Sequence, residues 1–173
     1  GYVDVARGKR GMEKMQKMLA ASDHPPYAPP FLKAGNLVIA QTANILQYLG
    51  PRHGLAPKSE AGRLWLHQVQ LTITDFVKEI HDTHHPLSSA LYYEQQTAAA
   101  KRYTDLFWKN RAPKYMGYFE RLLDGSRTVG GRSVSYVDLS LFQIVEGLRY
   151  AFPNRMRRFE RNVPKLVDLH DRI

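Results

Sequence analysis

Gln41 and Thr42 are the residues of this sequence best suited to bind a small anion. They follow a short apolar run, Leu37 to Ile39, and precede a segment with helical spacing of apolar residues, Ala43 to Leu49. A helix N-terminus has unpaired N–H groups and a partial positive charge, and a threonine there either caps the helix or offers its hydroxyl to a bound carboxylate. The sequence therefore predicts either an ordinary capped helix or a carboxylate site at this junction.

The elements that would position this pair are a β-hairpin and the helix after it. Two short apolar runs, Phe31 to Lys33 and Leu37 to Ile39, flank the turn residues Ala34-Gly35-Asn36. Pro29 and Pro30 stand directly before the first run. We expect two antiparallel strands, the second of which leads straight into the helix.

This order of elements resembles the second half of the thioredoxin-like domain of cytosolic glutathione transferases. There a proline, a hairpin, a Gln-Ser pair and an apolar helix follow one another; the proline is cis, its neighbour's backbone pairs with the cysteinyl unit of glutathione, and the Gln-Ser pair holds the γ-glutamyl carboxylate. The resemblance assigns glutathione binding to Pro29, Pro30, Gln41 and Thr42. Thr42 keeps the hydroxyl of the usual serine, and Pro29 stands where an aliphatic residue is more usual.

The segment before the hairpin predicts one more strand and one more helix. Residues 2–6 alternate as in a short strand, and Met12, Met15, Met18 and Leu19 recur at helical spacing, which predicts a core-facing stripe. The resemblance implies an incomplete thioredoxin-like α/β domain over residues 1–50, since the family has a further strand and helix ahead of this point. The family's catalytic Tyr, Ser or Cys lies there, so the catalytic residue of this sequence is unknown.

The remainder predicts a linker over residues 51–58 and an all-α helical bundle over residues 59–173. Breaker residues fill the linker, and Ser59 or a neighbour is expected to cap a helix that continues to about His84 and ends before Pro86. Further helices are expected from about Glu94 to Asn110 and from Pro113 to about Leu123. The first of these helices is expected to carry its apolar positions at Leu64, Trp65, Val69, Ile73, Phe76, Val77 and Ile80.

Ser135 and Asp138 have the spacing of a capping box, flanked by Val134 and Leu139 as a hydrophobic staple. This stretch resembles the start of the central helix in the C-terminal domain of glutathione transferases. In that family the box is structural. We therefore assign it no catalytic role.

The resemblance also suggests where an acceptor substrate binds and how the chain assembles. The family's acceptor site lies between the first domain and the early helices of the second, so Tyr92, Tyr93 or Tyr103 is expected to line a pocket for an electrophile. Asp75 resembles an acidic residue that in some classes reaches the glutathione amine across a dimer interface. A homodimer follows from the same resemblance.

Charge makes anionic ligands favourable, but it does not identify one. There are 25 Lys plus Arg against 16 Asp plus Glu, a net charge of +9, yet no zinc-finger spacing or RNA-binding strand motif occurs, so we expect no nucleic-acid partner. One basic cluster is interpreted either as a solvated helix end or as a patch that attracts anionic substrates. Its members are Arg149, Arg155, Arg157, Arg158 and Arg161.

The sequence also argues against several other classes of protein. Cysteine is absent, so no disulfide, thiolate nucleophile or cysteine metal site is available. His81, His84 and His85 share a helix end, but no further ligands stand nearby in sequence, and we expect no metal. No apolar run long enough for a membrane span and no signal peptide are found, which favours a cytoplasmic protein without a membrane partner.

The resemblance implies a glutathione transferase that adds the thiolate of glutathione, as cosubstrate, to an apolar small-molecule electrophile in detoxification. The class within the family is not assigned. The same fold also serves noncatalytic binding or assembly modules and glutathione-dependent isomerases, reductases and peroxidases, and these alternatives stay open.

Overall fold

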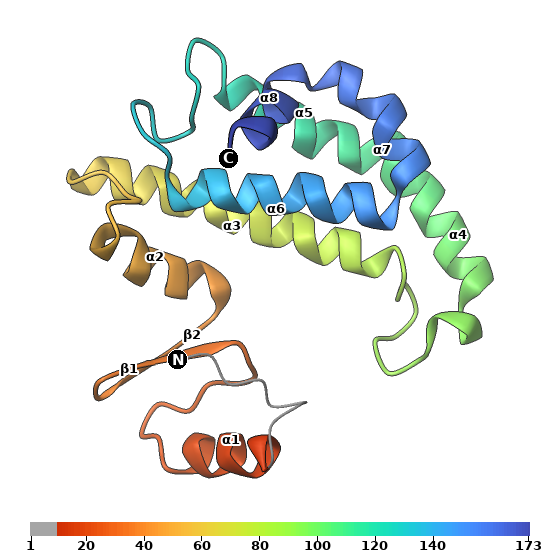
Figure 1. Cartoon of the computed structure of the whole chain (residues 1–173). Helices are drawn as coiled ribbons and strands as arrows, with labels where there is room; N and C mark the ends of the chain where they lie inside the picture. The colour runs from red at the N-terminus through yellow and green to blue at the C-terminus, as the bar shows by residue number, and fades with distance from the viewer. Residues whose placement is uncertain (1–9) are drawn as a thin grey trace. The chain divides into compact units, whose positions relative to one another are not determined.

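The structure is a computed structural model that describes residues 10–173 (Figure 1). The chain forms two compact units, Gly1–Tyr48 and Leu49–Ile173. The boundary falls inside helix α2 (Thr42–Arg52), which continues through Pro51 and Arg52, the first two residues of the predicted linker. The strand predicted for residues 2–6 lies outside the described residues.

The first unit contains the predicted helix and hairpin. Helix α1 (Gly11–Ala20) is followed by strands β1 (Phe31–Ala34) and β2 (Leu37–Ala40), which pair antiparallel. The turn between the strands contains Gly35 with a φ of 61°, a left-handed conformation that glycine adopts without steric cost. The hairpin and the helix on either side of it are therefore confirmed.

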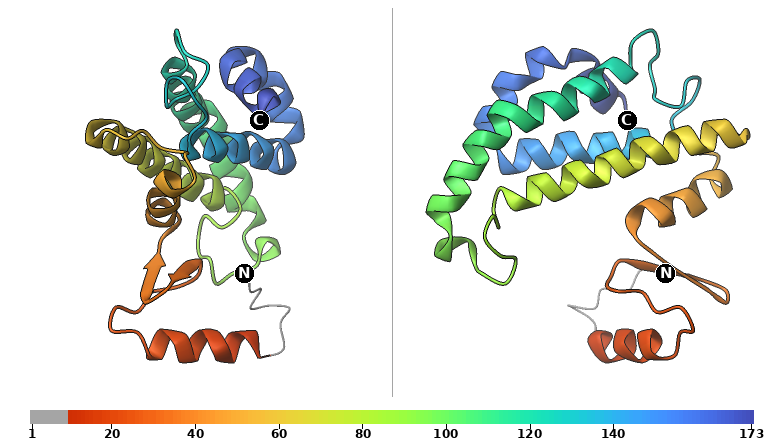
Figure 2. Two further views of the ribbon diagram at one scale, coloured as in Figure 1. Left: turned by 60° about the vertical axis from the view of Figure 1, so that its left-hand side comes forward. Right: turned by 180° about the vertical axis from the view of Figure 1, so that it is seen from behind.

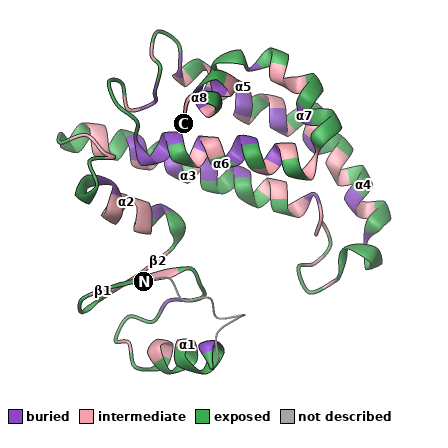
Figure 3. Cartoon of the chain, in the orientation of Figure 1, coloured by how far each residue is buried: buried purple, intermediate pink, exposed green. Residues whose placement is uncertain are grey.

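The methionine stripe of α1 is less buried than the sequence predicts. Gly11 is the only residue of this helix that is buried, and Met12 is 50% exposed. Met15, Met18 and Leu19 are partly exposed, and Figure 3 colours the helix mainly as exposed or intermediate. The prediction of a core-facing stripe is thus wrong for Met12, because helical periodicity identifies an apolar face but not how far that face is covered.

The second unit is all-helical, as predicted. In Figures 1 and 2, α4 and α5 join through a short π-helical segment, η2, into one bent run. No helix in residues 10–173 is long and apolar enough to cross a membrane. The elements are α3 (Glu60–Asp82), η1 (Tyr93–Gln95), α4 (Thr97–Leu106), η2 (Phe107–Arg111), α5 (Ala112–Leu122), α6 (Tyr136–Ala151), α7 (Pro153–Phe159), η3 (Glu160–Asn162) and α8 (Pro164–Arg172).

Helix α3 has nearly the predicted limits, and Val69, Ile73 and Phe76 among its predicted apolar positions are buried. The hydroxyl of Ser59 caps it by accepting from Gly62 N at 3.3 Å, and it ends at Asp82, ahead of Pro86. The buried apolar residues recur every three or four positions: Leu66, Val69, Ile73 and Phe76. The prediction was wrong for three positions that lie outside this stripe, because they face solvent: Leu64 (60% exposed), Trp65 (38%) and Val77 (49%).

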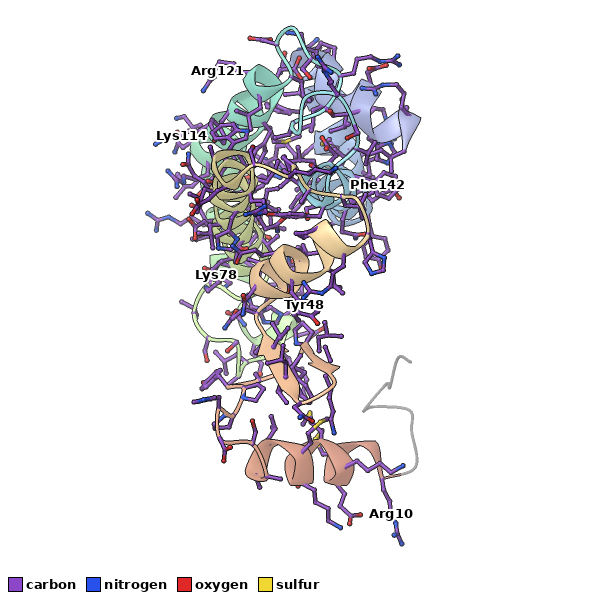
Figure 4. All side chains as sticks on the ribbon, turned by 90° about the vertical axis from the view of Figure 1, so that its left-hand side faces the viewer. Arg10, Tyr48, Lys78, Lys114, Arg121 and Phe142 are labelled. Carbon is purple, nitrogen blue, oxygen red and sulfur yellow. The ribbon has the colours of Figure 1, made fainter. Side chains whose placement is uncertain are left out.

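Helix α6 is the centre of the second unit, since it packs against α3, α7 and α8. The fully buried carboxylate of Asp138 accepts hydrogen bonds from Val129 N at 2.8 Å, Ser135 N at 2.7 Å and Ser135 Oγ at 2.6 Å. The capping box is therefore confirmed. Phe142 of α6, which is labelled in Figure 4, stacks on the ring of His170, with ring centroids 4.6 Å apart.

The π-helical segment η2 places a cation where it neutralises a carboxylate of α3. Arg111 donates to Glu79 through Nε at 2.7 Å, and Tyr115 donates to the same carboxylate at 3.0 Å. The hydrogen bond from Arg111 is the main cause that lowers the pKa of Glu79, against the opposing effect of burial. Pro113 lies in the first turn of α5, as predicted, yet it does not separate two helices, because η2 connects them.

Candidate functional site

Strand β2 leads directly into helix α2, with a single residue between the two elements. That residue, Gln41, has a φ of 66°, a left-handed conformation uncommon for residues other than glycine. Its carbonyl accepts the first helical hydrogen bond, from Ile45 N at 2.9 Å. Thr42 is then the first residue of α2, and both Gln41 and Thr42 are exposed.

The N-terminus of α2 has donors available for a ligand. No side-chain hydrogen bond of Thr42 occurs within the described part of the chain, and the first turn of α2 contains no acidic residue. The first N–H groups of an α-helix have no partner within the helix and lie at the positive end of its dipole. This end of α2 can therefore accept a carboxylate, with the threonine hydroxyl as an additional donor.

The hairpin register brings the two prolines to the same place. Phe31 pairs with Ala40 across the strands, so the residues that flank this pair, Pro30 and Gln41, lie at the same end of the hairpin. The peptide bond between Pro29 and Pro30 is cis, and both prolines are exposed. The fold thus gathers Pro29, Pro30, Gln41 and Thr42 at one exposed corner of the first unit.

Asp75 lies on α3 in the second unit. It is exposed, and it follows Leu71 by four residues and Leu64 by eleven, which places all three on one side of the helix. Leu64 and Leu71 are 60% and 48% exposed. Asp75 is therefore part of an exposed apolar strip on α3.

Two of the cavities in the second unit are formed near the C-terminal end of α3. The first, which we call the α3 cavity, has a volume of about 590 Å³, and the residues that line it include Val77, Lys78, His81, His85, Leu87 and Ser88. The second, the α4–α7 cavity, has a volume of about 560 Å³, and its lining includes His84, Tyr93, Lys101, Thr104, Phe152 and Arg155. Both volumes lie within the range of small-molecule sites, roughly 300–1,000 Å³.

Of the three predicted tyrosines, Tyr93 alone lines one of these two cavities. Tyr93 lines the α4–α7 cavity, whereas Tyr92 is 77% exposed and lines neither of these two cavities. Tyr103 lies on α4, and burial, with a contribution from Asp82 and Glu79, raises its pKa. The expected role of these tyrosines in an electrophile pocket stays a prediction, for which Tyr93 is the best placed.

The three histidines divide between the two cavities. His81 and His85 stack with ring centroids 5.0 Å apart and line the α3 cavity, and His84 lines the other. Beside His81, Lys78 donates to Asp82 at 2.6 Å; burial opposes ionisation of Asp82, but the hydrogen bonds from Lys78 and His81 outweigh it and lower its pKa. Among residues 10–173 no group of three or more His, Cys, Asp or Glu side chains is arranged to hold a metal ion.

Several cavity residues were not identified from the sequence. The spacing of Val77, His81 and His85, each four residues apart, is a signal that could have indicated one shared face of α3. Lys101 and Arg155 come from α4 and α7, and no spacing relates them. Their convergence depends on how the helices of the second unit pack together.

Comparison with known proteins agrees with this architecture. Residues 81–173 match the family model described as the C-terminal domain of glutathione S-transferase. The chain is 23% identical over 162 residues to a glutathione S-transferase of Plasmodium yoelii yoelii, a match that covers 91% of this chain and 71% of the relative. It is also 23% identical over 168 residues to one of Plasmodium falciparum, covering 91% and 73%.

Solved structures show the same fold. The chain resembles a Pi-class glutathione S-transferase of Onchocerca volvulus with a TM-score of 0.69 and 20% identity, covering 92% of this chain and 70% of that one. It resembles the glutathione S-transferase Blo t 8 with a TM-score of 0.66 and 20% identity, covering 94% and 70%. The matching domain model spans more than half of the sequence, and from it we conclude that this chain belongs to the glutathione S-transferase family.

Proposed function

We propose that this protein binds glutathione at the β2–α2 junction and joins it, through its thiolate, to an apolar electrophile. The observation that carries the proposal is the hairpin register, which places the prolines opposite Gln41 and Thr42 at the free N-terminus of α2. In the reaction the thiolate sulfur attacks an electrophilic carbon, a C–S bond forms, the leaving group departs with its electron pair, and the thiol proton passes to solvent. The group that ionises the thiol is not assigned to a residue of this sequence.

The γ-glutamyl carboxylate is proposed to bind at the start of α2. There it would accept from main-chain N–H groups and from the hydroxyl of Thr42, and hydrogen bonds to an ionised acceptor are stronger than neutral ones. The backbone beside Pro30 would pair with the cysteinyl unit, as the family membership implies. Glutathione is then the cosubstrate, and no metal takes part.

The α3 cavity is the better supported site for the electrophile. Val77 and Leu87, which line it, are 49% and 66% exposed, and they offer apolar surface to an uncharged ring. The stacked imidazoles of His81 and His85 add flat surface beside them. The tyrosine prediction provides the competing location, at Tyr93.

A homodimer is part of the same proposal. The exposed strip on α3 that contains Leu64, Leu71 and Asp75 carries two large apolar side chains, which a second copy would remove from water. Asp75 is proposed to reach the glutathione amine of the partner copy. The cytoplasmic location and the role in detoxification likewise remain proposals.

Binding of glutathione tests the first step. Isothermal titration of the full chain should detect glutathione binding, and T42A should weaken it by about 10- to 100-fold, the equivalent of one hydrogen bond to a charged group. T72A is a matched control, because Thr72 lies on α3 and its hydroxyl donates to Gln68 O at 3.1 Å. Equal affinity of T42A and T72A for glutathione would rule out the junction as the site. Absence of glutathione binding in the unmodified protein would support the noncatalytic alternative.

Conjugation assays distinguish the two locations for the electrophile. With chlorodinitrobenzene as the acceptor, V77W should fill part of the α3 cavity and raise KM for the acceptor, while KM for glutathione stays unchanged. Y93A should leave both KM values near those of the unmodified protein. The reverse pattern would move the acceptor site to Tyr93.

A further inference from the structure

The loop that follows α3 forms part of the α3 cavity, the site proposed for the electrophile. Leu87, Ser88 and Ser89 of this loop line the cavity together with Val77 and His81 of the helix. A loop that lines a site selects a ligand only if other groups hold the loop in one conformation. The contacts that hold this loop therefore bear on which electrophile the cavity accepts.

The side chain of Gln96 holds the loop. This glutamine directly precedes α4 and is only 3% exposed. Its Oε1 accepts from Leu87 N at 3.0 Å and from Ser88 N at 3.5 Å, and its Nε2 donates to Ser88 O at 3.0 Å and to Leu91 O at 3.1 Å. These partners fix the orientation of the amide, because the reverse orientation would set its NH₂ group against two N–H donors.

The same contacts determine which nitrogen of His85 carries the proton. Nδ1 of His85 lies 3.2 Å from Leu91 O, which can only accept, and 3.3 Å from Gln96 Nε2. Both protons of that amide nitrogen are engaged by carbonyl groups at shorter distances. Nδ1 therefore donates to Leu91 O, and in the neutral imidazole the lone pair is left on Nε2.

Nε2 of His85 is available as a hydrogen-bond acceptor. It makes no hydrogen bond within residues 10–173. In the same part of the chain, the buried side-chain atoms without a partner are nitrogens of His67 and Trp108, so Nε2 of His85 is open to solvent. Since His85 lines the α3 cavity, an N–H or O–H group of a ligand bound there can pair with this nitrogen.

The other polar groups of the cavity are better satisfied. Lys78 and Asp82, both of which line it, neutralise each other at 2.6 Å. The hydroxyl of Thr74 donates its proton to Gln70 O at 3.0 Å. The cavity therefore favours an uncharged ligand, and Nε2 of His85 is the acceptor left to orient it.

We propose that His85 is a specificity-determining residue of the α3 cavity and that Gln96 positions it. The cavity then prefers an uncharged aromatic electrophile that carries a hydroxyl or N–H group. This group donates to Nε2 of His85 while the ring lies against Val77 and Leu87. That such a ligand is the acceptor of the reaction rests on the proposed function.

A hydroxyl-bearing acceptor and its methyl ether test this preference. The two compounds, meta-hydroxybenzalacetone and meta-methoxybenzalacetone, have similar electrophilic double bonds, but only the first has an O–H donor. In isothermal titration of the full chain without glutathione, the hydroxyl compound should bind about three- to tenfold more tightly, the equivalent of one hydrogen bond between neutral groups. In conjugation the sulfur bonds to the β-carbon, the π electrons pass to the carbonyl oxygen, and the enolate takes a proton from solvent; KM should show the same preference.

Two histidine variants test the acceptor itself. H85F should abolish the preference for the hydroxyl compound, because a phenyl ring preserves the size of the side chain but cannot accept a hydrogen bond. H81F is the matched control and should retain the preference. His81 also lines the cavity, but it is 50% exposed and its Nδ1 lies 3.4 Å from Asp82, so its ring is held less firmly.

Two glutamine variants test the positioning. Q96L removes the hydrogen bonds to the loop and should weaken the preference. Q95L should retain it, because Gln95 is exposed, does not line the cavity and accepts from Tyr92 N at 2.8 Å. Equal preferences in Q96L and Q95L would contradict the role of Gln96.

A ¹⁵N spectrum of the imidazoles reports the proton positions without turnover. The signals of His85, assigned with H85F, should show a protonated Nδ1 and an unprotonated Nε2, and Q96L should shift them toward a mixture of tautomers, which a loss of stability alone would not cause. Equal affinities of the two compounds, equal effects of H85F and H81F, or a protonated Nε2 would each overturn the proposal. If the preference is found but neither compound is conjugated, the proposed function fails and the specificity of the cavity stands.

Discussion

The two units of this chain prepare their candidate sites in different ways. At the corner of the first unit the donors are main-chain groups and one hydroxyl, all contributed by residues 29–42 and positioned by a strand pair, a cis peptide bond and a left-handed Gln41. In the second unit the cavities are formed by side chains from segments as far apart in sequence as Thr83 and Arg155. Local backbone geometry determines the first site, and helix packing determines the second.

This difference predicts how each site responds to substitution. A site made of main-chain groups tolerates side-chain changes unless they alter the backbone or remove its hydroxyl. A cavity between helices depends on the stability of the bundle around it. The following variants test this contrast in order of decreasing expected effect.

Loss of the buried carboxylate of Asp138 should be the most damaging change to the helical unit. D138A leaves Val129 N and the donors of Ser135 without their acceptor, which should lower the free energy of unfolding by about 3 kcal/mol or more. Urea titration followed by circular dichroism measures it. D168N is the control, since that carboxylate is 64% exposed and pairs with Arg172 on the surface; comparable losses in both variants would contradict the importance of the box.

A side chain at Gly50 should disturb the start of α6, the helix that the capping box begins. A Cβ at this position would lie 2.5 Å from the buried ring of Tyr136, whose N–H donates to Leu55 O at 3.0 Å. G50A should therefore destabilise the protein by about 1–3 kcal/mol in thermal unfolding.

The opposite sign is expected for the matched glycine of α6. At Gly147 a Cβ meets no atom within 4 Å, and G147A should raise stability by up to about 1 kcal/mol through helix propensity. Destabilisation by both alanines would show that crowding at Tyr136 is not the cause.

Substitution of Gln41 should separate stability from binding in the first unit. Q41G relieves the left-handed backbone and should change the free energy of unfolding by at most about 1 kcal/mol in the stabilising direction. It should change glutathione affinity by less than about threefold, because the donors proposed at this corner are main-chain groups and the hydroxyl of Thr42. Q16G, in the exposed middle of α1, should lower stability instead and leave affinity unchanged; a large loss of affinity in Q41G would show that its side chain takes part in binding.

The smallest effect concerns His84 and pH. Because burial lowers its pKa below the ordinary 6.5, the unfolded chain takes up the proton first, so this contribution to stability is complete above pH 6.5 and is lost as the pH falls through the pKa of the folded state. H84F should reduce the difference in unfolding free energy between about pH 7.5 and about pH 5 by less than about 1 kcal/mol. H53F, an exposed histidine outside both cavities, should leave it unchanged.

The elements that were predicted well are those encoded by neighbouring residues. The hairpin, the Ser59 cap of α3 and the capping box at Ser135 each depend on residues within a few positions of one another. Predictions of which face is buried were less successful. Leu64 and Val77 face solvent although their spacing is helical, because apolar periodicity cannot say which side of a long helix meets its neighbours.

The same distinction between local and long-range determinants applies to the candidate sites. The sequence alone determined the family resemblance and the four residues at the hairpin corner, since turn residues, prolines and a helix start act on the backbone within a short stretch of chain. Only the tertiary structure decided that Tyr93 lines a cavity whereas Tyr92 and Tyr103 line neither of the two cavities, and that Lys101, His84 and Arg155 surround one of them. Side chains from distant segments meet according to how whole helices pack, and that arrangement is settled by the core as a unit rather than by any local pattern.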